Sequence, residues 1–317
     1  MDYVFVFISG AVLLVYSAEK LIDQLVTIAR GLRISLFLLA VVFTGIEFDD
    51  VFLGVALNVE DLGDVALGTV FGTALSLVGI VLALAAILTP TEVRVPRDYL
   101  VIFAAAPLVM VVFALTPLGL VDGIVLLALF VLFIGYVAVR EPRRDKPVFR
   151  DTEVLESTGR RAGWAGIGFA VLAVCGLVVG SATVGIGTGG ILATYGLDGT
   201  LFGATIATLV LTVEDVFLTV EPVRRGAPEI GVGNVIGSVV FSVTGKLGII
   251  LLTGGLTVGR YVLSWHLPVL VVLTGAAAVF LSTGRLRRWH GWVLLGLYVA
   301  YWVVSYGVFD GVPTEVD

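Results

Sequence analysis

Residues 49–53 read Asp-Asp-Val-Phe-Leu, and residues 214–218, which begin 165 positions later, read Glu-Asp-Val-Phe-Leu. Both stretches lie in the middle of long apolar segments. A carboxylate at the centre of a membrane helix costs about 2.5–3.5 kcal/mol on insertion scales, and such acids are usually functional. An acidic pair at the same point of both halves therefore indicates a path for cations that is built from a duplicated unit.

The composition of the chain is that of a membrane protein. Hydrophobic residues make up 58% of it, the mean hydropathy is +1.08, and charged residues make up 14%, against about 25% in soluble proteins. Because backbone polar groups in lipid must be satisfied within the segment, we predict an all-α membrane protein with ten transmembrane helices. The ten apolar segments lie at about 2–19, 34–57, 65–89, 99–116, 119–139, 163–193, 200–223, 230–253, 261–283 and 289–309.

Two further features narrow the class of protein. No basic stretch precedes the first apolar segment, which we therefore interpret as a first span and not as a cleaved signal peptide. The single cysteine, Cys175, excludes an intramolecular disulfide framework and a cysteine-based metal cluster. We interpret Cys175 as a small packing residue within a helix.

Basic residues fall at alternate connections between the apolar segments. Arginines occur within 30–33, 94–97, 140–161, 224–225 and 285–288, whereas the intervening connections are acidic or neutral apart from Arg260. By the positive-inside rule the arginine-bearing connections are cytoplasmic, so ten spans place both termini on the extracytoplasmic side. We therefore expect a multi-pass plasma-membrane protein, and the short central loop favours a prokaryotic host.

The longest polar stretch, residues 140–162, separates two similar halves. At a constant offset of 165, eight residues between positions 50 and 72 are identical to those between 215 and 237. Five helices per half is an odd number, so the two copies must insert in opposite orientations, as in many secondary transporters. We predict a first repeat at 1–139, a cytoplasmic linker at 140–162 and an inverted second repeat at 163–317. The basic linker has a second interpretation as a lipid-headgroup or regulatory patch.

Oxygen-bearing side chains gather in equivalent helix pairs of the two halves. Carboxylates, hydroxyls and backbone carbonyls freed near glycines are the hard ligands that suit sodium, calcium or magnesium. No Cys or His accompanies them, which argues against zinc or copper. Glu47 and Asp50 are three positions apart, which predicts that they share a helix face. The candidate ligands are Glu47, Asp49, Asp50, Thr73, Glu214, Asp215, Ser238 and Ser242.

Each of these features also has a structural interpretation. The spacing of Gly68 and Gly72, repeated at 233 and 237, is typical of plain helix packing in membranes. Asp50 and Asp215 can be read as hydrogen-bonded structural acids. The acids at 60–64 form either a solvated loop or a vestibule that attracts cations.

Lys246 is the only basic residue well inside a predicted span, one turn beyond Ser242. Either its side chain snorkels to the outer surface, or it is a built-in counter-ion that occupies a place an ion would otherwise hold, since buried charges are usually paired. The second interpretation implies altered ion selectivity, proton coupling in place of sodium, or loss of transport.

The signature segments resemble those of the calcium/cation antiporter superfamily, which includes sodium/calcium exchangers. In that family each half carries a motif like G-T-S-x-P-E followed by G-N-x-x-G-S-N. Here residues 45–50 and 210–215 stand at the first motif, and residues 68–74 and 233–239 (Gly-Asn-Val-Ile-Gly-Ser-Val) at the second. The resemblance covers essentially the whole chain and implies ten helices in two inverted halves. It also implies that Asp50 and Asp215, with Thr73 and Ser238, ligate calcium, or sodium in exchange.

The chain departs from this pattern at several positions. Both signature glutamates are aspartates, and Asp49 and Glu214 replace the preceding prolines, which removes the helix breaker and adds two acids. Glu47 stands where the family has a hydroxyl. Leu77 and Ser242 stand where the family often has Asn or Asp.

The sequence thus predicts a secondary active cation antiporter of sodium/calcium exchanger type, which moves Ca²⁺ or another cation against Na⁺ by alternating access. Glu47, Asp49 and Glu214 are expected to be auxiliary ligands or proton acceptors. Two alternatives stay open: a cation/proton antiporter of the same fold, and a transport-inactive homologue locked by Lys246. The sequence contains no recognisable nucleophile–base pair of the kind that would indicate an enzyme. We therefore expect no enzymatic activity, and we expect no cofactor. The expected partners are the lipid bilayer and inorganic cations, not nucleic acid, and no oligomeric state is indicated.

Overall fold

Long apolar runs form helices here, because a helix satisfies its own backbone groups where no water is available. The computed structural model describes residues 2–32, 45–59, 63–140, 164–195, 208–259 and 262–308. The first half contains α1 (Asp2–Leu32), α3 (Phe48–Val59), α4 (Gly63–Ser76), α5 (Ala83–Leu88), α6 (Arg97–Phe113) and α7 (Leu120–Arg140). The second contains α8 (Trp164–Tyr195), α10 (Thr208–Arg224), α11 (Pro228–Val240), α12 (Leu247–Leu251), α13 (Leu267–Ser282) and α14 (Arg288–Val308).

Three π-helical segments are continuous with these helices. η1 (Leu77–Leu82) joins α4 to α5, η4 (Phe241–Lys246) joins α11 to α12, and η5 (Val262–His266) leads into α13. η1 and η4 follow the glycine-bearing helices at nearly equivalent positions of the two halves. Because π-bulges inside α-helices occur frequently at functional sites, these two junctions are candidate positions for a functional site.

The mostly helical, membrane-type architecture predicted from the composition is confirmed. Within the described residues, five helices are long and apolar enough to cross a membrane: Asp2–Gln24, Ala66–Leu88, Leu120–Arg140, Pro228–Leu251 and Val262–Ser282. Helices also lie in the other segments that the sequence predicted to be spans. Residues 34–44 of the predicted second span and nearly all of the predicted linker lie outside the described residues.

The two halves have the same order of elements, shifted by about 165 residues. α4 begins at Gly63 and α11 at Pro228, and α6 begins at Arg97 where η5 begins at Val262. The contacts between the halves are also equivalent in pairs. α5 lies against α14 just as α12 lies against α7, and α6 packs on its own equivalent, α13. Each half therefore completes the packing of the other.

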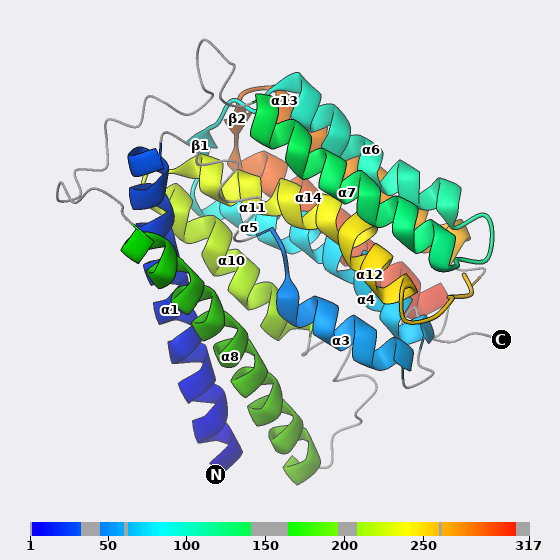
Figure 1. The fold of residues 1–317 in the computed structure, drawn as a ribbon, viewed down its shortest axis with the longest axis horizontal. Helices are drawn as coiled ribbons and strands as arrows, with labels where there is room; N and C mark the ends of the chain where they lie inside the picture. Colours follow the sequence, from blue (N-terminus) through cyan, green and yellow to red (C-terminus); the bar gives the residue numbers. More distant parts are fainter. Residues whose placement is uncertain are drawn as a thin grey trace.

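Helices α1 and α8 pack closely along each other and form a pair beside the remaining helices. In Figure 1 the N-terminal end of α1 and the C-terminal end of α8 extend beyond the rest of the bundle, and α10 lies between this pair and the other helices. Contacts of α1 and of α8 with α10 join this pair to the other helices.

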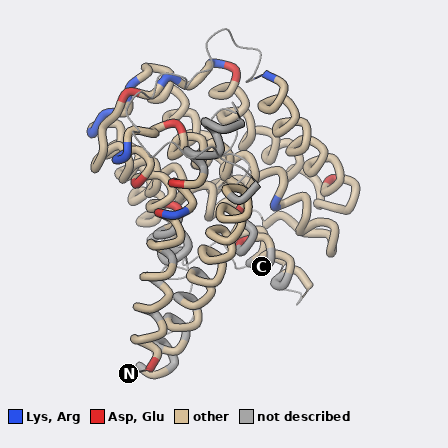
Figure 2. The backbone as a smooth tube through the Cα atoms, turned by 60° about the vertical axis from the view of Figure 1, so that its left-hand side comes forward, with Lys and Arg blue, Asp and Glu red and all other residues tan. Residues whose placement is uncertain are grey.

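Basic residues gather toward one end of the bundle (Figure 2). Ion pairs at this end connect different elements: Arg140 Nε lies 3.5 Å from Asp98 Oδ2, and Arg285 lies 2.8 Å from Glu92. Arginines that are far apart in the sequence therefore share one face of the molecule, as the positive-inside pattern predicts for connections on the same side of a membrane.

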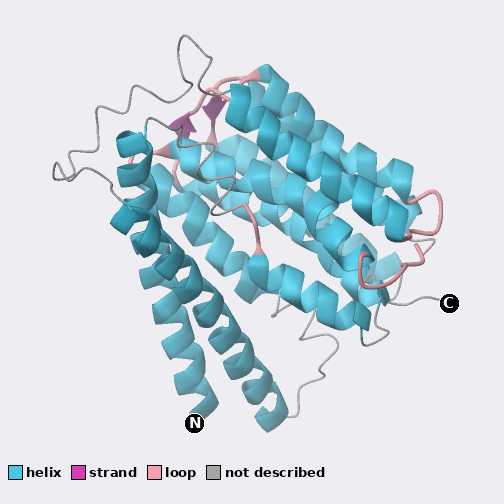
Figure 3. Ribbon diagram, viewed as in Figure 1, coloured by secondary structure: helices cyan, strands magenta, loops and turns pink. Residues whose placement is uncertain are grey.

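Two small strands and one isolated bridge tie the halves together. β1 (Thr91–Glu92) pairs antiparallel with β2 (Arg285–Leu286), as Figure 3 shows. Leu118 and Leu256 exchange backbone hydrogen bonds of 2.9 and 2.8 Å. Leu256 is 165 positions after Thr91, so the bridge and the sheet occur at equivalent places of the two halves.

Small residues let the helices of the two halves cross closely. A Cβ at Gly248 of α12 would lie 2.9 Å from the carbonyl oxygen of Gly123 in α7. At the equivalent crossing, a Cβ at Gly291 of α14 would collide with the carbonyl oxygen of Ala83 in α5. Close backbone approach at small residues is a common basis of helix association in membranes.

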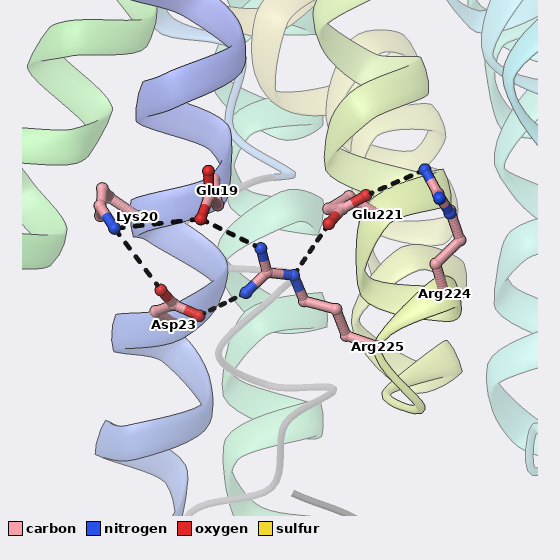
Figure 4. A network of polar contacts seen from close by, with 6 residues as sticks. All are labelled: Glu19, Lys20, Asp23, Glu221, Arg224 and Arg225. Atoms are coloured by element: carbon pink, nitrogen blue, oxygen red, sulfur yellow. Dashed lines mark hydrogen bonds and ion pairs between the residues drawn. The ribbon is translucent and has the colours of Figure 1, made fainter. Parts of the chain in front are cut away.

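A polar network fastens α1 to the end of α10 (Figure 4). The guanidinium of Arg225 lies 2.7 Å from Asp23 Oδ1, 2.9 Å from Glu221 Oε1 and 3.3 Å from Glu19 Oε1. The hydrogen bond to Glu221 is the largest cause that raises the pKa of Arg225, so its charge persists despite partial burial. Arg224 contacts Glu221 at 3.6 Å and its side chain is 67% exposed.

We expect Gly291→Ala to lower the midpoint of thermal unfolding, because overpacking against a backbone carbonyl costs about 1–3 kcal/mol. Gly296→Ala on the same helix is the matched control, since a Cβ there meets nothing within 4 Å. Thermal unfolding of the purified protein in detergent checks both variants. Equal midpoints for the two would contradict the close crossing of α14 and α5.

Arg225→Ala should destabilise the protein by about 1 kcal/mol, whereas Arg224→Ala should change stability little, because exposed single pairs contribute at most about 1 kcal/mol. The difference should shrink at high salt, which screens partly exposed charges. Thermal unfolding at low and high salt measures it. A destabilisation that is the same for both arginines would show that the network does not fasten α1 to α10.

Candidate functional site

Four polar side chains form a buried stripe along α11 and η4. Asn234, Ser238, Ser242 and Lys246 follow one another at intervals of four residues, and each is 0% exposed. Residues four apart lie on one face of a helix, so the four side chains line one face of the α11–η4 segment. Burying polar groups is unfavourable unless they are paired, and three of the four have partners on α3, on α4, on α10 or just before α3.

At one end of the stripe, Lys246 meets the acid of the first half. Lys246 Nζ lies 2.6 Å from Asp50 Oδ2 on α3. The same carboxylate oxygen accepts a hydrogen bond of 2.8 Å from Thr73 Oγ1 on α4. Asp50 is buried at 4% exposure, so its charge is compensated inside the bundle and not by solvent.

In the middle of the stripe, Ser242 meets Glu47. Ser242 Oγ donates to Glu47 Oε2 at 3.3 Å. Glu47 is buried, but it lies just before α3 after a bend at 45–46, and its carbonyl accepts from Val51 N at 3.1 Å. Glu47 and Asp50 were expected to share a helix face; the helix begins at Phe48, directly after Glu47, and the two carboxylates both contact the stripe, at Ser242 and at Lys246.

At the other end, Asn234 meets the acid of the second half. Asn234 Nδ2 lies 3.5 Å from Asp215 Oδ1 and 3.2 Å from Thr219 Oγ1, both on α10. α10 and α11 approach closely here, because a Cβ at Gly231 would collide with the carbonyl oxygen of Thr219. The stripe therefore joins acids of both halves.

Two buried oxygen atoms of the stripe have no hydrogen-bond partner among the described residues: Ser238 Oγ and Asn234 Oδ1. Buried polar atoms without partners are rare, and each calls for an explanation such as a water molecule or an ion. Ser238 lies one turn from both Asn234 and Ser242, between the two acidic ends. Its position leaves an oxygen available to a hard cation.

Several predicted site residues cannot be placed in this arrangement. The side chains of Asp49 and Glu214 lie outside the described residues, as do those of the acids at 60, 61 and 64. Among the side chains that are described, no three His, Cys, Asp or Glu groups converge to hold a metal ion. The described part of the site therefore combines separate acids with hydroxyl, amide and ammonium groups.

The two halves differ in the polar residues of these helices. The positions equivalent to Asn234, Ser242 and Lys246 are Thr69, Leu77 and Val81, so the stripe of the first half ends after Thr73. The intervals of four between positions 234 and 246 are visible in the sequence and were the signal for a single polar face. Asn58 was also missed: its side-chain nitrogen lies 3.1 Å from the carbonyl oxygen of Ile250 and ties α3 to α12.

Curated relatives resemble the chain over nearly its full length. The sodium/calcium exchanger MaX1 of Methanosarcina acetivorans is 23% identical over 337 residues, which cover 94% of this chain and 96% of the relative. Inner membrane protein YrbG of Escherichia coli is 26% identical, with coverages of 94% and 95%. The putative antiporter CaxA of Alkalimonas amylolytica is 23% identical, with coverages of 92% and 95%.

Comparison with solved structures identifies the same fold. The sodium-calcium exchanger NCX_Mj, soaked with Na⁺ and Sr²⁺, superimposes with a TM-score of 0.81 at 19% identity, covering 96% of this chain and 98% of that chain. The family model described as sodium/calcium exchanger protein matches residues 3–139 and 165–307. The resemblance predicted from the signature segments is thereby confirmed, and the chain belongs to the sodium/calcium exchanger protein family.

Proposed function

We propose that the chain is a secondary active cation antiporter of sodium/calcium exchanger type, which moves Ca²⁺ or another cation against Na⁺ by alternating access. Membership of the family supports this, together with relatives named as a sodium/calcium exchanger and a putative antiporter. The observation that carries the proposal is the buried stripe from Asn234 to Lys246, which joins acids of both halves inside an apolar bundle. Because the chain belongs to a family of exchangers, we also expect that it is not an enzyme.

The proposed architecture is ten spans in two inverted repeats, at 1–139 and 163–317, joined by a cytoplasmic linker at 140–162. The constant offset of 165 between equivalent elements and the reciprocal packing of the halves support it. The basic end of the bundle is the proposed cytoplasmic end. Both termini are then proposed to be extracytoplasmic. A relative named as an inner membrane protein supports a location in a plasma membrane.

The proposed ion path runs along the stripe past both halves. Asp50, with Thr73, lies at one end, and Asp215, with Asn234, lies at the other. Glu47, Ser242 and Ser238 lie between them, and Asp49 and Glu214 are proposed as auxiliary ligands or proton acceptors. Carboxylate and hydroxyl oxygens suit Na⁺ and Ca²⁺. Since the inverted repeats place the site near the midplane, rocking of one half against the other exposes it alternately to each side.

A transport-inactive protein is the second candidate, favoured by the contact of 2.6 Å between Lys246 and Asp50. A cation already bound to the acid, and attached to the chain, would lock the site against ions. A cation/proton antiporter of the same fold is distinguished from the first candidate by its coupling ion.

Uptake of radioactive calcium into proteoliposomes tests the proposal, with a sodium gradient and then a proton gradient imposed. We expect sodium-driven uptake that Asp215→Asn lowers about 10–100-fold, because loss of a charged ligand costs about 1.5–3 kcal/mol. Glu92→Gln, which changes an exposed acid of β1, is the control and should transport normally. Uptake with the proton gradient alone would identify proton coupling, and no uptake by the wild type under either gradient would support the locked candidate.

A further inference from the structure

The ammonium of Lys246 is held by three oxygen atoms. Nζ lies 2.6 Å from Asp50 Oδ2, 3.2 Å from the carbonyl oxygen of Thr69 and 3.3 Å from Thr73 Oγ1. An ammonium has three N–H donors and no acceptor, so these three partners satisfy it. All three lie on α3 and α4 of the first half, whereas Lys246 belongs to η4 of the second half.

The side chain of Lys246 does not reach a surface. It is 0% exposed, and every residue of η4 is buried. Snorkelling places a charged head at an interface, which is incompatible with this burial. The lysine is therefore an internal counter-ion in its geometry, and its charge is compensated by Asp50.

The three oxygen atoms are a ligand set for a small cation. A carboxylate, a hydroxyl and a backbone carbonyl are the groups that bind hard cations in proteins. Nothing in this set requires that the cation be an ammonium attached to the chain. A free monovalent cation at the same point would carry the same charge and meet the same oxygens.

The first half has no lysine at the position equivalent to Lys246. The position equivalent to Lys246 in the first half is Val81, a buried apolar residue. Asp215, the acid equivalent to Asp50, meets the amide of Asn234. The ammonium of Lys246 therefore has no counterpart at the equivalent position of the first half.

The geometry points to a tethered cation: the ammonium of Lys246 permanently occupies a monovalent-cation position formed by Asp50, Thr69 and Thr73. Asp50 then serves the tethered charge, and mobile cations bind in the part of the stripe near Glu47, Ser238 and Asp215. This deepens the proposed function and rests on it for the identity of the mobile ions. It implies that this chain binds one mobile cation fewer than a protein in which both equivalent acids bind mobile cations.

The test removes the tether and asks whether a free cation replaces it. The variants are Lys246→Ala, which keeps Asp50, and Lys246→Ala combined with Asp50→Asn, which removes the position altogether. Lys20→Ala on α1 is the control for loss of an exposed lysine, whose ion pairs are 4.0 Å long. Each full-length protein is purified in detergent, and its thermal midpoint is measured as choline chloride is replaced stepwise by sodium or potassium chloride.

We expect the thermal midpoint of Lys246→Ala to rise more with sodium or potassium than the midpoints of the wild type, the Lys20 variant and the double variant do, because only Lys246→Ala has an additional site for a cation. Binding to the folded state stabilises it in proportion to the logarithm of the cation concentration above the dissociation constant. Equilibrium binding of radioactive sodium should show about one additional ion per chain in Lys246→Ala. Recovery of that variant only in sodium or potassium salts would support the same conclusion.

The same cation dependence in Lys246→Ala and in the double variant would overturn the inference and leave a structural ion pair only. Failure to recover Lys246→Ala in any of these salts would also overturn it, because a free cation then cannot replace the ammonium. These measurements need no transport. If Lys246→Ala binds an additional cation but the wild type does not transport, the inference is sustained and the proposed function is refuted. If the wild type transports but Lys246→Ala binds no additional cation, the proposed function is sustained and the inference is overturned.

Discussion

The contact of 2.6 Å between Lys246 and Asp50 is the interaction on which the site depends. Both side chains are buried, and a buried charge that loses its partner is strongly destabilising, by about 3–5 kcal/mol. The pair also joins η4 of the second half to α3 of the first. The position of η4 relative to α3 and α4 is therefore set by charge compensation as well as by packing.

Equivalent elements recur in the two halves of the chain at an offset of about 165 residues. Both halves have the same element order, the same π-helical junction and the same close crossing between small residues, at Gly248 in one case and Gly291 in the other. Their polar residues have diverged. Asp50 contacts a lysine, whereas the equivalent Asp215 contacts an asparagine. Two aspartates at equivalent backbone positions therefore have chemically different partners.

Hydropathy was sufficient to predict the helical membrane architecture, because it is a property of local sequence, and the resemblance of the signature segments predicted the family. They also selected Asp50, Thr73 and Lys246, which the structure brings together. The partners themselves depend on how distant helices pack, and no local pattern encodes that. For the same reason, the exclusion of Glu47 from α3 and the hydrogen bond from Ser242 to Glu47 were not predicted.

The most direct measurement is anomalous X-ray scattering from crystals of Lys246→Ala and of the wild type, both soaked in a thallium(I) salt. Thallium is a monovalent cation that scatters strongly, so its position can be located independently of the protein atoms. If the ammonium of Lys246 occupies a cation position, the variant shows a peak between Asp50 Oδ2, Thr73 Oγ1 and the carbonyl oxygen of Thr69, and the wild type shows none at that point. A variant crystal with thallium bound elsewhere but no peak there would contradict it.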